Sequence, residues 1–322
     1  MSFLVNPAFK SSTLVIGGAG FIGAHLVPLL QSSGRQVTVL GRKPKPMYQL
    51  PEGAVYVQGD FGQIDLLRSL LDRHREVIYL AYATVPNTSF DNPQADLLQN
   101  LPSAIQLFSE VAIRNGQLLL VSSGGAVYGE AMKLPLTENH PAKPISPYGV
   151  TKLTLENYAH LYSVIHGLRH VCVRPANAYG IGQQPFVGQG FISTAIASSL
   201  QGKSLHIFGQ NGTIRDYIYV GDLAAGIVSA LDQGKLGEIY NIGSGVGMSN
   251  LEVIAAITPL VREIGCNVSV GHLPERAFDV KANVLDSSKL QADTGWSVKV
   301  GFIDGLIATL DWLKSLPSNA KN

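Results

Sequence analysis

The chain has 322 residues with a formal net charge of +1, and 46% of its residues are hydrophobic. This balance excludes the strongly basic footprint of a nucleic-acid-binding protein, and no apolar stretch is long enough to span a bilayer. The two cysteines, Cys172 and Cys266, lie in apolar settings, and residues 1–13 carry no basic region followed by a long apolar run. We therefore expect a cytoplasmic α/β protein without nucleic-acid, membrane or metal partners.

Apolar runs alternate with amphipathic segments through the first half of the chain. The pattern predicts strands at residues 13–18, 36–41, 54–60, 76–83, 117–123 and 169–175. The helices predicted between them span residues 21–34, 64–74, 96–116 and 146–167. Strands without polar alternation, separated by helices, are typical of a parallel sheet that helices cover on both faces. We therefore expect a Rossmann-type, doubly wound dinucleotide-binding domain over residues 1–178.

The regular alternation stops after about residue 178, where Gly-rich turns become frequent. Residues 179–322 are expected to form a smaller C-terminal α/β substrate-binding lobe, with parts of about 214–245 returning to the large domain. Ligands of open α/β sheets bind beyond the carboxyl ends of the strands, so this lobe would cover that edge.

The stretch "GGAGFIG" follows the first predicted strand and has the spacing G-x-x-G-x-x-G. Such a loop binds dinucleotides because its glycines permit a tight turn, close approach of a pyrophosphate, and close packing of helix and strand. A purely structural glycine turn is the alternative. The cofactor contacts expected from this loop are Gly17, Gly20, Phe21, Ile22 and Gly23.

The second predicted strand ends in "VLGRKPKP", where Gly41 occupies the place of the acid that usually marks an NAD site. Arg42 and Lys43 follow it without a nearby carboxylate, which favours NADP among the NAD(P) cofactors. The alternative is a solvated turn beside bound NAD. Asp60 ends the third strand and could accept a hydrogen bond from an adenine amino group, or it could cap a helix.

The stretch "SPYGVTK" predicts a helix that begins at Ser146, with Pro147 at its first position. Tyr148 and Lys152 then lie one turn apart on the same face. The helix dipole and the ammonium would both lower the pKa of the phenol and make Tyr148 a usable base. An exposed tyrosine and lysine on a solvated helix are the alternative.

The stretch "VSSGGAVYG" places Ser122 and Ser123 at the end of the fifth strand, on the edge where a nicotinamide is expected. The glycine loop, the serines and the Tyr148–Lys152 helix thus converge on one edge of the sheet. This convergence favours a catalytic Tyr148, with Lys152 also binding the nicotinamide ribose.

The chain resembles the extended short-chain dehydrogenases/reductases of the NAD(P)-dependent nucleotide-sugar epimerase/dehydratase family. The resemblance covers nearly the whole chain and includes the motifs "GGAGFIG", "SSGGAVYG", "SPYGVTK", "RPANAYG", "RDYIYVGDLA", "YNIGSG" and "ERAFD". Within the family, the functional resemblance is nearest to enzymes that epimerise UDP-hexoses at C4. It implies a nucleotide sugar as substrate, a transient keto-sugar, and a homodimer that pairs helices 96–116 and 146–167.

The resemblance also implies roles for individual residues. Asn177 would contact the sugar diphosphate, Arg215 would pair with a phosphate, and Arg276 with Asp279 would hold a phosphate and the ribose. Ion pairs of Arg215 with Asp216 and of Arg276 with Asp279 are the structural alternatives. The remaining cofactor contacts expected from the motifs are Phe61, Ala81 and Asn100, of which Asn100 could also be a helix-surface amide.

One departure from the family pattern concerns the serine stretch. The 4-epimerases that the chain resembles usually carry the catalytic hydroxyl at the third residue of this stretch, and a threonine often follows two places later. In this chain these positions are Gly124 and Ala126. The hydroxyl beside Tyr148 is therefore expected from Ser123, Ser122 or water. Two other functions stay open: an NADP(H)-dependent reductase of a keto-sugar or other carbonyl compound, and a dinucleotide-sensing protein without catalysis.

Overall fold

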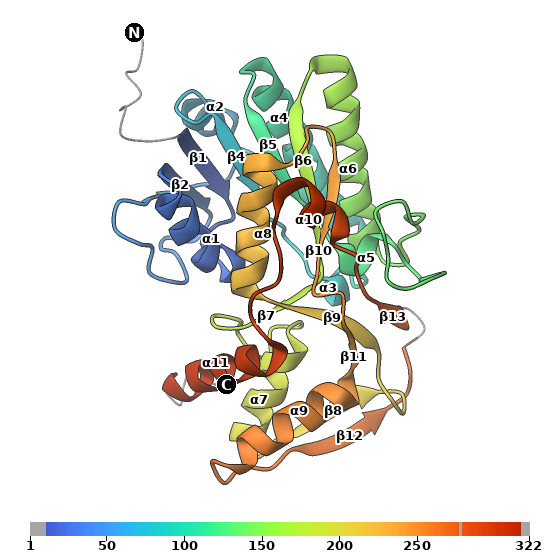
Figure 1. Cartoon of the computed structure of the whole chain (residues 1–322). Coiled ribbons are helices and arrows are strands. Elements are labelled where there is room, and N and C mark those ends of the chain that lie inside the picture. Colours follow the sequence, from blue (N-terminus) through green and yellow to red (C-terminus); the bar gives the residue numbers. More distant parts are fainter. Residues whose placement is uncertain (1–10, 277–278, 317–322) are drawn as a thin grey trace.

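A seven-stranded parallel sheet forms the centre of the larger domain (Figure 1). The computed structural model describes residues 11–276 and 279–316, so the segment on which the signal-peptide expectation mainly rests lies outside it. The strand order is β10-β6-β5-β4-β1-β2-β3, which is the doubly wound order with one further strand at its edge. The strands are β1 (Ser11–Ile16), β2 (Arg35–Gly41), β3 (Val55–Gln58), β4 (Glu76–Tyr79), β5 (Gln117–Val121), β6 (Arg169–Pro175) and β10 (Ile239–Ile242).

Helices cover both faces of this sheet. On one face α1 (Phe21–Ser32) packs against α8 (Val220–Gln233), and on the other α4 (Pro93–Ile113) packs against α6 (Pro147–His166), with α2 (Ile64–Leu71) beside α4. Successive side chains of a strand point to opposite faces, so each strand feeds two cores. In β1, Val15 joins the core under α1 and α8, whereas Leu14 and Ile16 join the core under α4 and α6.

Local signals set the ends of α6, as the sequence predicted. The Ser146 side chain accepts a hydrogen bond from the Gly149 N–H at 3.1 Å, and Pro147 is the first helical residue. Gly167 ends α6 with φ at 67°, a left-handed conformation that a residue with a side chain rarely adopts.

The predicted strands are confirmed, but four of them end two to four residues early. Residues 17–18, 59–60, 80–83 and 122–123 leave the sheet and form the loops at its carboxyl edge. An apolar run continues past the last ladder hydrogen bond because these loops also pack against their neighbours, so hydrophobicity alone overestimates strand length.

The smaller lobe has its own core and two small sheets. It contains β7 (Asn177–Tyr179), β8 (Ser204–Phe208), β9 (Ile214–Tyr219), β11 (Gly247–Ser249), β12 (Ser269–Leu273), β13 (Ala282–Asn283), α7 (Phe191–Leu200), α9 (Asn250–Arg262) and α11 (Phe302–Ser315). The helices α7, α9 and α11 contact one another below the large sheet (Figure 1). The remaining short helices are α3 (Pro86–Ser89), α5 (Gly124–Val127) and α10 (Ser288–Thr294).

The chain passes back into the large domain after entering the lobe. β10 pairs with β6 in the large sheet, α8 packs on α1, and α10 contacts both α8 and β10. The division at residue 178 therefore describes the order of the chain, and the spatial boundary crosses it more than once.

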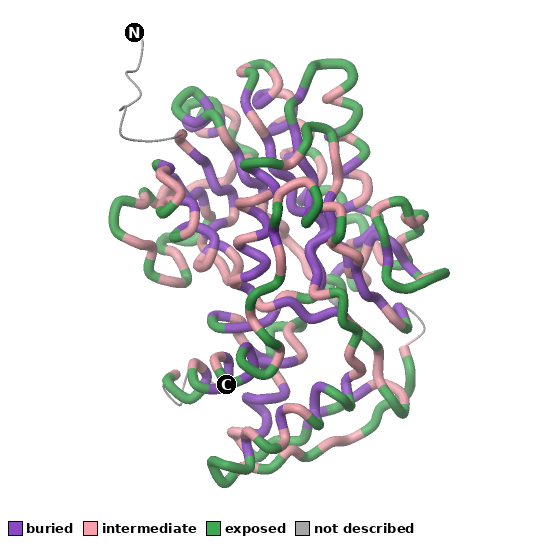
Figure 2. Tube along the Cα trace, viewed as in Figure 1, coloured by how far each residue is buried: buried purple, intermediate pink, exposed green. Residues whose placement is uncertain are grey.

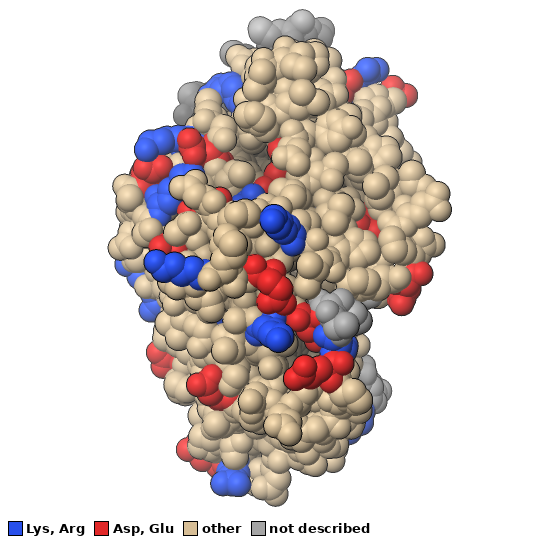
Figure 3. Space-filling view, turned by 90° about the vertical axis from the view of Figure 1, so that its right-hand side faces the viewer, with Lys and Arg blue, Asp and Glu red and all other residues tan. Residues whose placement is uncertain are grey.

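Burial follows this two-part plan. Figure 2 shows buried residues along the strands and the helix sides that face them, with exposed residues in the outer loops. Lys, Arg, Asp and Glu are interspersed on the face drawn in Figure 3. Within the described ranges, no helix is long and apolar enough to cross a membrane.

Candidate active site

Two cavities lie at the carboxyl edge of the large sheet. The first has a volume of about 250 Å³ and is lined from the ends of β1, β2, β3 and β4. The second has a volume of about 920 Å³ and lies between the sheet edge and the small lobe. Leu80 and Tyr82, in the loop after β4, line both cavities, so the two cavities share a wall there.

The glycine loop shapes the space in front of α1. Gly17 has φ at 85°, and a Cβ added to it would lie 2.6 Å from the Ala81 backbone N. A Cβ at Gly23 would lie 2.0 Å from the Gly18 carbonyl oxygen, so helix and strand pack as closely as predicted. A Cβ at Gly20 would meet no protein atom within 4 Å, which leaves open space above the N-terminus of α1. This loop therefore fits a bound pyrophosphate.

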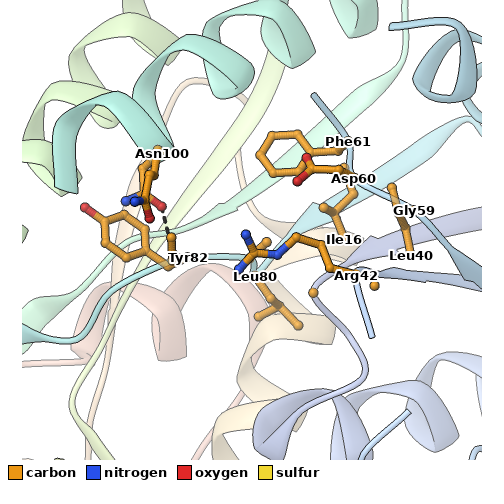
Figure 4. A pocket seen from close by; sticks show the side chains of 14 residues that line it. Ile16, Leu40, Arg42, Gly59, Asp60, Phe61, Leu80, Tyr82 and Asn100 are labelled. Atoms are coloured by element: carbon orange, nitrogen blue, oxygen red, sulfur yellow. Dashed lines mark hydrogen bonds between the residues drawn. The ribbon is translucent and has the colours of Figure 1, made fainter. Parts of the chain in front are cut away.

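Three more residues expected to bind the cofactor line the first cavity, shown in Figure 4. Arg42 and Asp60 lie at the ends of β2 and β3, and Phe61 packs its ring 5.3 Å from the Tyr79 ring. The Asp60 side chain accepts a hydrogen bond from the Gly62 N–H and does not cap α2, whose N-cap residue is Gln63. Lys43 is exposed and does not line either cavity, so only one of the two predicted cations faces the cofactor site.

The other side of the first cavity is formed by Asn100, Ala81 and the loop after β4 (Figure 4). Asn100 is 2% exposed and is not a helix-surface amide. Its Oδ1 accepts a hydrogen bond from the Ala83 N–H at 2.9 Å, and its Nδ2 donates to the Asp96 carbonyl at 2.7 Å. Asn100 thereby holds the loop that separates the two cavities.

Phe21 and Ile22, at the start of α1, line the second cavity together with Tyr148 and Lys152. Lys152 is 3% exposed, and its ammonium donates a hydrogen bond to the Val121 carbonyl at 2.9 Å. Its Nζ lies 5.8 Å from the centroid of the Tyr148 ring. The helix thus presents both side chains to the end of β5, and neither is a solvated surface residue.

The protonation of this pair differs from the expectation. Burial raises the pKa of Tyr148 to about 12, although a hydrogen bond with the Ser123 side chain lowers it in part. Burial also lowers the pKa of Lys152 to about 8. Desolvation disfavours both charged forms and is the largest cause of both pKa shifts.

The two serines after β5 take different positions. Ser122 is 4% exposed, and its hydroxyl donates a hydrogen bond to Glu156 behind the cavity wall. Ser123 lines the second cavity and is the serine that interacts with the Tyr148 phenol. Both serines that the sequence left open line the second cavity, but only the hydroxyl of Ser122 is engaged by Glu156.

Gly124 has no room for a side chain. An added Cβ would lie 2.5 Å from Leu285 Cδ1 and 2.9 Å from the Arg174 carbonyl oxygen. A hydroxyl at this position, which the resemblance led us to look for, is excluded by Leu285 and by the backbone at the end of β6.

The four residues expected to bind substrate all line the second cavity: Asn177, Arg215, Arg276 and Asp279. Arg276 and Asp279 form an ion pair at 2.8 Å, as the structural alternative predicted, and the Arg276 guanidinium lies 3.9 Å from the Phe208 ring centroid. The alternative ion pair of Arg215 with Asp216 does not form. The fully buried Asp216 carboxylate accepts from Ser244 instead, and Arg215 donates to the Ile214 carbonyl.

Sequence reasoning missed two residues of the site. Tyr82 directly follows Ala81, and its ring centroid lies 4.8 Å from that of Tyr148. Asp96 is fully buried and accepts hydrogen bonds from Tyr82, Thr84 and Thr151. The position of Tyr82 at the end of a buried strand was a usable signal, whereas Asp96 carried none.

The parallel sheet, the glycine loop and the Tyr148–Lys152 pair define a short-chain dehydrogenase/reductase fold. The model of the NAD dependent epimerase/dehydratase family matches residues 13–243. The chain belongs to this family.

Relatives with different activities are similar to the chain over nearly its whole length. The dTDP-glucose 4,6-dehydratase of an Actinoplanes species is 31% identical over 319 residues, covering 94% of this chain and 97% of the relative. The UDP-glucose 4-epimerase of Thermotoga maritima, solved with UDP-glucose, is 29% identical with a TM-score of 0.87 over 94% and 98% of the two chains. The UDP-glucose 4-epimerase of Thermus thermophilus, solved with NAD, is 31% identical with a TM-score of 0.87 over 94% and 99%.

Proposed function

We propose that this protein is an NAD-dependent epimerase that inverts C4 of a nucleotide-linked hexose, with a UDP-sugar as the favoured substrate. The family is shown by the comparisons, and the choice between epimerase and dehydratase is our inference. The observation that carries it is the set of ionisable groups around the second cavity.

A dehydratase needs an acid and a base beside the sugar in order to eliminate water. The positions that follow Ser123 are Gly124, Gly125 and Ala126, which carry neither. Among the described residues that line the second cavity, Asp279 is the only carboxylate, and Arg276 holds it in an ion pair. A tyrosine, a lysine and a serine suffice for a reversible oxidation of an alcohol, so this lining favours epimerisation.

In this proposal Tyr148 is the base that removes the proton from the sugar hydroxyl, and it later returns the proton. The Ser123 hydroxyl bridges the Tyr148 phenol and the sugar oxygen through hydrogen bonds. Lys152 stays protonated, stabilises the phenolate, and binds ribose hydroxyls of the cofactor. A bound NAD, which the glycine loop and Lys152 would hold, would supply reversible hydride transfer at C4. Inversion would follow if the keto-sugar turned before its reduction, with no net redox.

The nucleotide end of the substrate supplies the binding energy, and the sugar end is free to turn. Arg215 and Arg276 are proposed to bind the diphosphate, because guanidinium groups bind phosphates in a bidentate manner. Asp279 would accept from the ribose hydroxyls, and Asn177 would donate to the diphosphate. The volume of about 920 Å³ is large enough for such a ligand and a rotating sugar.

We propose NAD as the cofactor. The preference for NADP finds no support, because Lys43 does not line the first cavity, the family is described as NAD dependent, and the Thermus thermophilus structure holds NAD. Of the two cations, Arg42 alone lines the first cavity.

The protein is proposed to be a cytoplasmic homodimer. Its thiols, Cys172 and Cys266, are free, which suits a reducing compartment. The adjacent helices α4 and α6 expose apolar side chains, among them Ile113 at 73%, Val164 at 71% and Ile165 at 61%. A dimer should appear in sedimentation equilibrium, and Val164→Glu should yield monomers.

The test of function is incubation of the purified chain with NAD and either UDP-glucose or UDP-N-acetylglucosamine, without a reductant. We expect the 4-epimer to appear in NMR spectra without net formation of NADH. Tyr148→Phe should lower turnover by ~100-fold or more while NAD still binds, whereas Tyr162→Phe, on the same helix outside the cavity, should leave turnover unchanged. A product lighter by one water would show a dehydratase, and stoichiometric consumption of NADPH by a keto-sugar would show a reductase.

A further inference from the structure

Tyr82 contacts both members of the catalytic pair. The Tyr82 ring meets the Tyr148 ring at an interplanar angle of 70°, with centroids 4.8 Å apart. The Lys152 Nζ lies 4.3 Å from the Tyr82 ring centroid. The ammonium is therefore closer to the Tyr82 ring than to the Tyr148 ring, at 5.8 Å. An aromatic face at this distance attracts a cation electrostatically.

The Lys152 ammonium has few other partners. It donates one hydrogen bond, to the Val121 carbonyl, and the side chain is buried. The charged groups that act on it are Glu156 on α6 and Asp96 on α4, with Cys172 on β6 as a third titratable group. Glu156 is engaged by Arg174, Asp96 accepts from three hydroxyls, and burial raises the pKa of Cys172, so this thiol is neutral. Of the two aromatic rings beside the ammonium, that of Tyr82 is the nearer, and it adds a stabilising contact to the bond with Val121.

The ring is itself held in place. The Tyr82 hydroxyl donates a hydrogen bond to the Asp96 carboxylate at 3.2 Å, and the Thr151 hydroxyl donates to the same oxygen at 2.7 Å. Thr151 precedes Lys152 on α6, so Asp96 links the loop after β4 to the helix that carries the catalytic pair. Burial and the nearby Asp96 carboxylate raise the pKa of Tyr82 above its ordinary value, so the phenol stays neutral.

We propose that Tyr82 is a positioning residue for the catalytic pair, whose ring keeps the Lys152 ammonium charged and beside Tyr148. This inference rests on the catalytic roles proposed for Tyr148 and Lys152. Removal of the ring takes a stabilising contact from the buried ammonium, so Lys152 releases its proton at a lower pH. The phenolate of Tyr148 then loses a neighbouring positive charge, and a higher pH is needed to form it.

The direct test is the titration of Lys152 by NMR in the full chain saturated with NAD. The protein carries lysine labelled with ¹³C at Cε, and the Lys152 signal is the one that Lys152→Met removes. We expect Tyr82→Phe, which keeps the ring, to titrate like the wild type. Tyr82→Met and Tyr82→Leu should lower the pKa of Lys152 by roughly 0.5 to 1.5.

A second measurement covers the case in which the aliphatic variants do not fold. Fluorinated phenylalanines incorporated at position 82 keep the shape of the ring and weaken its negative face. Each added fluorine should then lower the Lys152 titration midpoint further. In steady-state kinetics of Tyr82→Met, kcat should fall and its pH profile should shift to higher pH, while the KM for the UDP-sugar changes little.

The proposal is overturned if Tyr82→Met and the fluorinated series all titrate like the wild type. It is also overturned if Tyr82→Phe lowers the pKa of Lys152 as much as Tyr82→Met does. The hydrogen bond from the Tyr82 hydroxyl to Asp96, and not the ring, would then stabilise the ammonium. The titration needs no substrate, so a wild type that fails to epimerise would refute the proposed function and leave this test intact.

Discussion

Arg174 and Glu156 form a buried ion pair one turn of α6 away from Lys152. The Arg174 Nη2 lies 2.6 Å from the Glu156 Oε2, and the two side chains are 5% and 3% exposed. Glu156 follows Lys152 by one turn of α6 and also accepts a hydrogen bond from the Ser122 hydroxyl. The Arg174 guanidinium lies 4.7 Å from the Tyr128 ring centroid. The pair joins α6 to β6 and β5 at the floor of the active site.

Removal of one member of this pair should be strongly destabilising. Arg174→Met leaves the Glu156 carboxylate buried without its cation, and we expect the free energy of unfolding to fall by ~3 to ~5 kcal/mol. Urea denaturation monitored by circular dichroism measures this loss. The double variant Arg174→Met/Glu156→Met should recover most of it, because it leaves no unpaired buried charge. A single variant as stable as the wild type would show that the pair contributes nothing.

The buried Lys152 makes stability depend on pH. Its pKa is lowered from 10.5 to about 8 in the folded protein, so the folded state loses the proton first as the pH rises. Below about pH 8 the buried ammonium of Lys152 lowers the free energy of unfolding of the wild type. This free energy rises again between about pH 8 and 10.5, where folded Lys152 is neutral and unfolded Lys152 is still charged. The regained amount is about 3 kcal/mol at most.

Lys152→Met lacks this titration and is the matched reference. We expect the unfolding free energy of the wild type, measured relative to Lys152→Met, to increase from pH 7.5 to pH 10.5. A difference that stays constant over this range would contradict the lowered pKa of Lys152.

Gly124 should not tolerate a side chain. In Gly124→Ala the new Cβ would lie 2.5 Å from Leu285 Cδ1 and close to two backbone carbonyls, and we expect a loss of about 1 to 3 kcal/mol in unfolding free energy. Gly125→Ala is the control, because the nearest atom to its Cβ, the Asn177 Oδ1, lies 3.3 Å away. Equal melting temperatures for the two variants would refute the packing argument.

Arg215 should contribute to nucleotide binding more than to stability. Burial lowers its pKa, and it forms no ion pair within residues 11–276 and 279–316, so its charge is available to a ligand. We expect Arg215→Met to raise the Kd of UDP, measured by calorimetry, by roughly 10- to 100-fold. Arg68→Met removes an arginine on α2 that pairs with Glu110 outside both cavities, and it should leave the Kd unchanged. An unaltered Kd in Arg215→Met would place the phosphates elsewhere.

Several features of the site were predictable because they depend on short stretches of sequence. The glycine spacing predicted the turn at Gly17 and the close packing at Gly23, and both are found. Ser146 and Pro147 predicted where α6 begins, which places Tyr148 and Lys152 on one face. The direction of the pKa shift of Tyr148 was mispredicted, since desolvation depends on everything that packs around the helix and not on the helix alone.

Side-chain direction and contacts between distant segments were decided only by the tertiary structure. Adjacent serines of one loop have different partners, because Ser122 donates to Glu156 whereas Ser123 interacts with Tyr148. Tyr82 and Asp96 acquire their importance only where the loop after β4 meets α4 and α6.

Local hydrophobic periodicity and capping by themselves determined the main strands and helices up to residue 175 and the parallel sheet that they form. Both act within a few residues of the chain and can be read directly from it. The width of the cavity, the choice of hydroxyl and the charges of the catalytic groups arise from atoms far apart in sequence. Burial sets them, and burial exists only after the chain has folded.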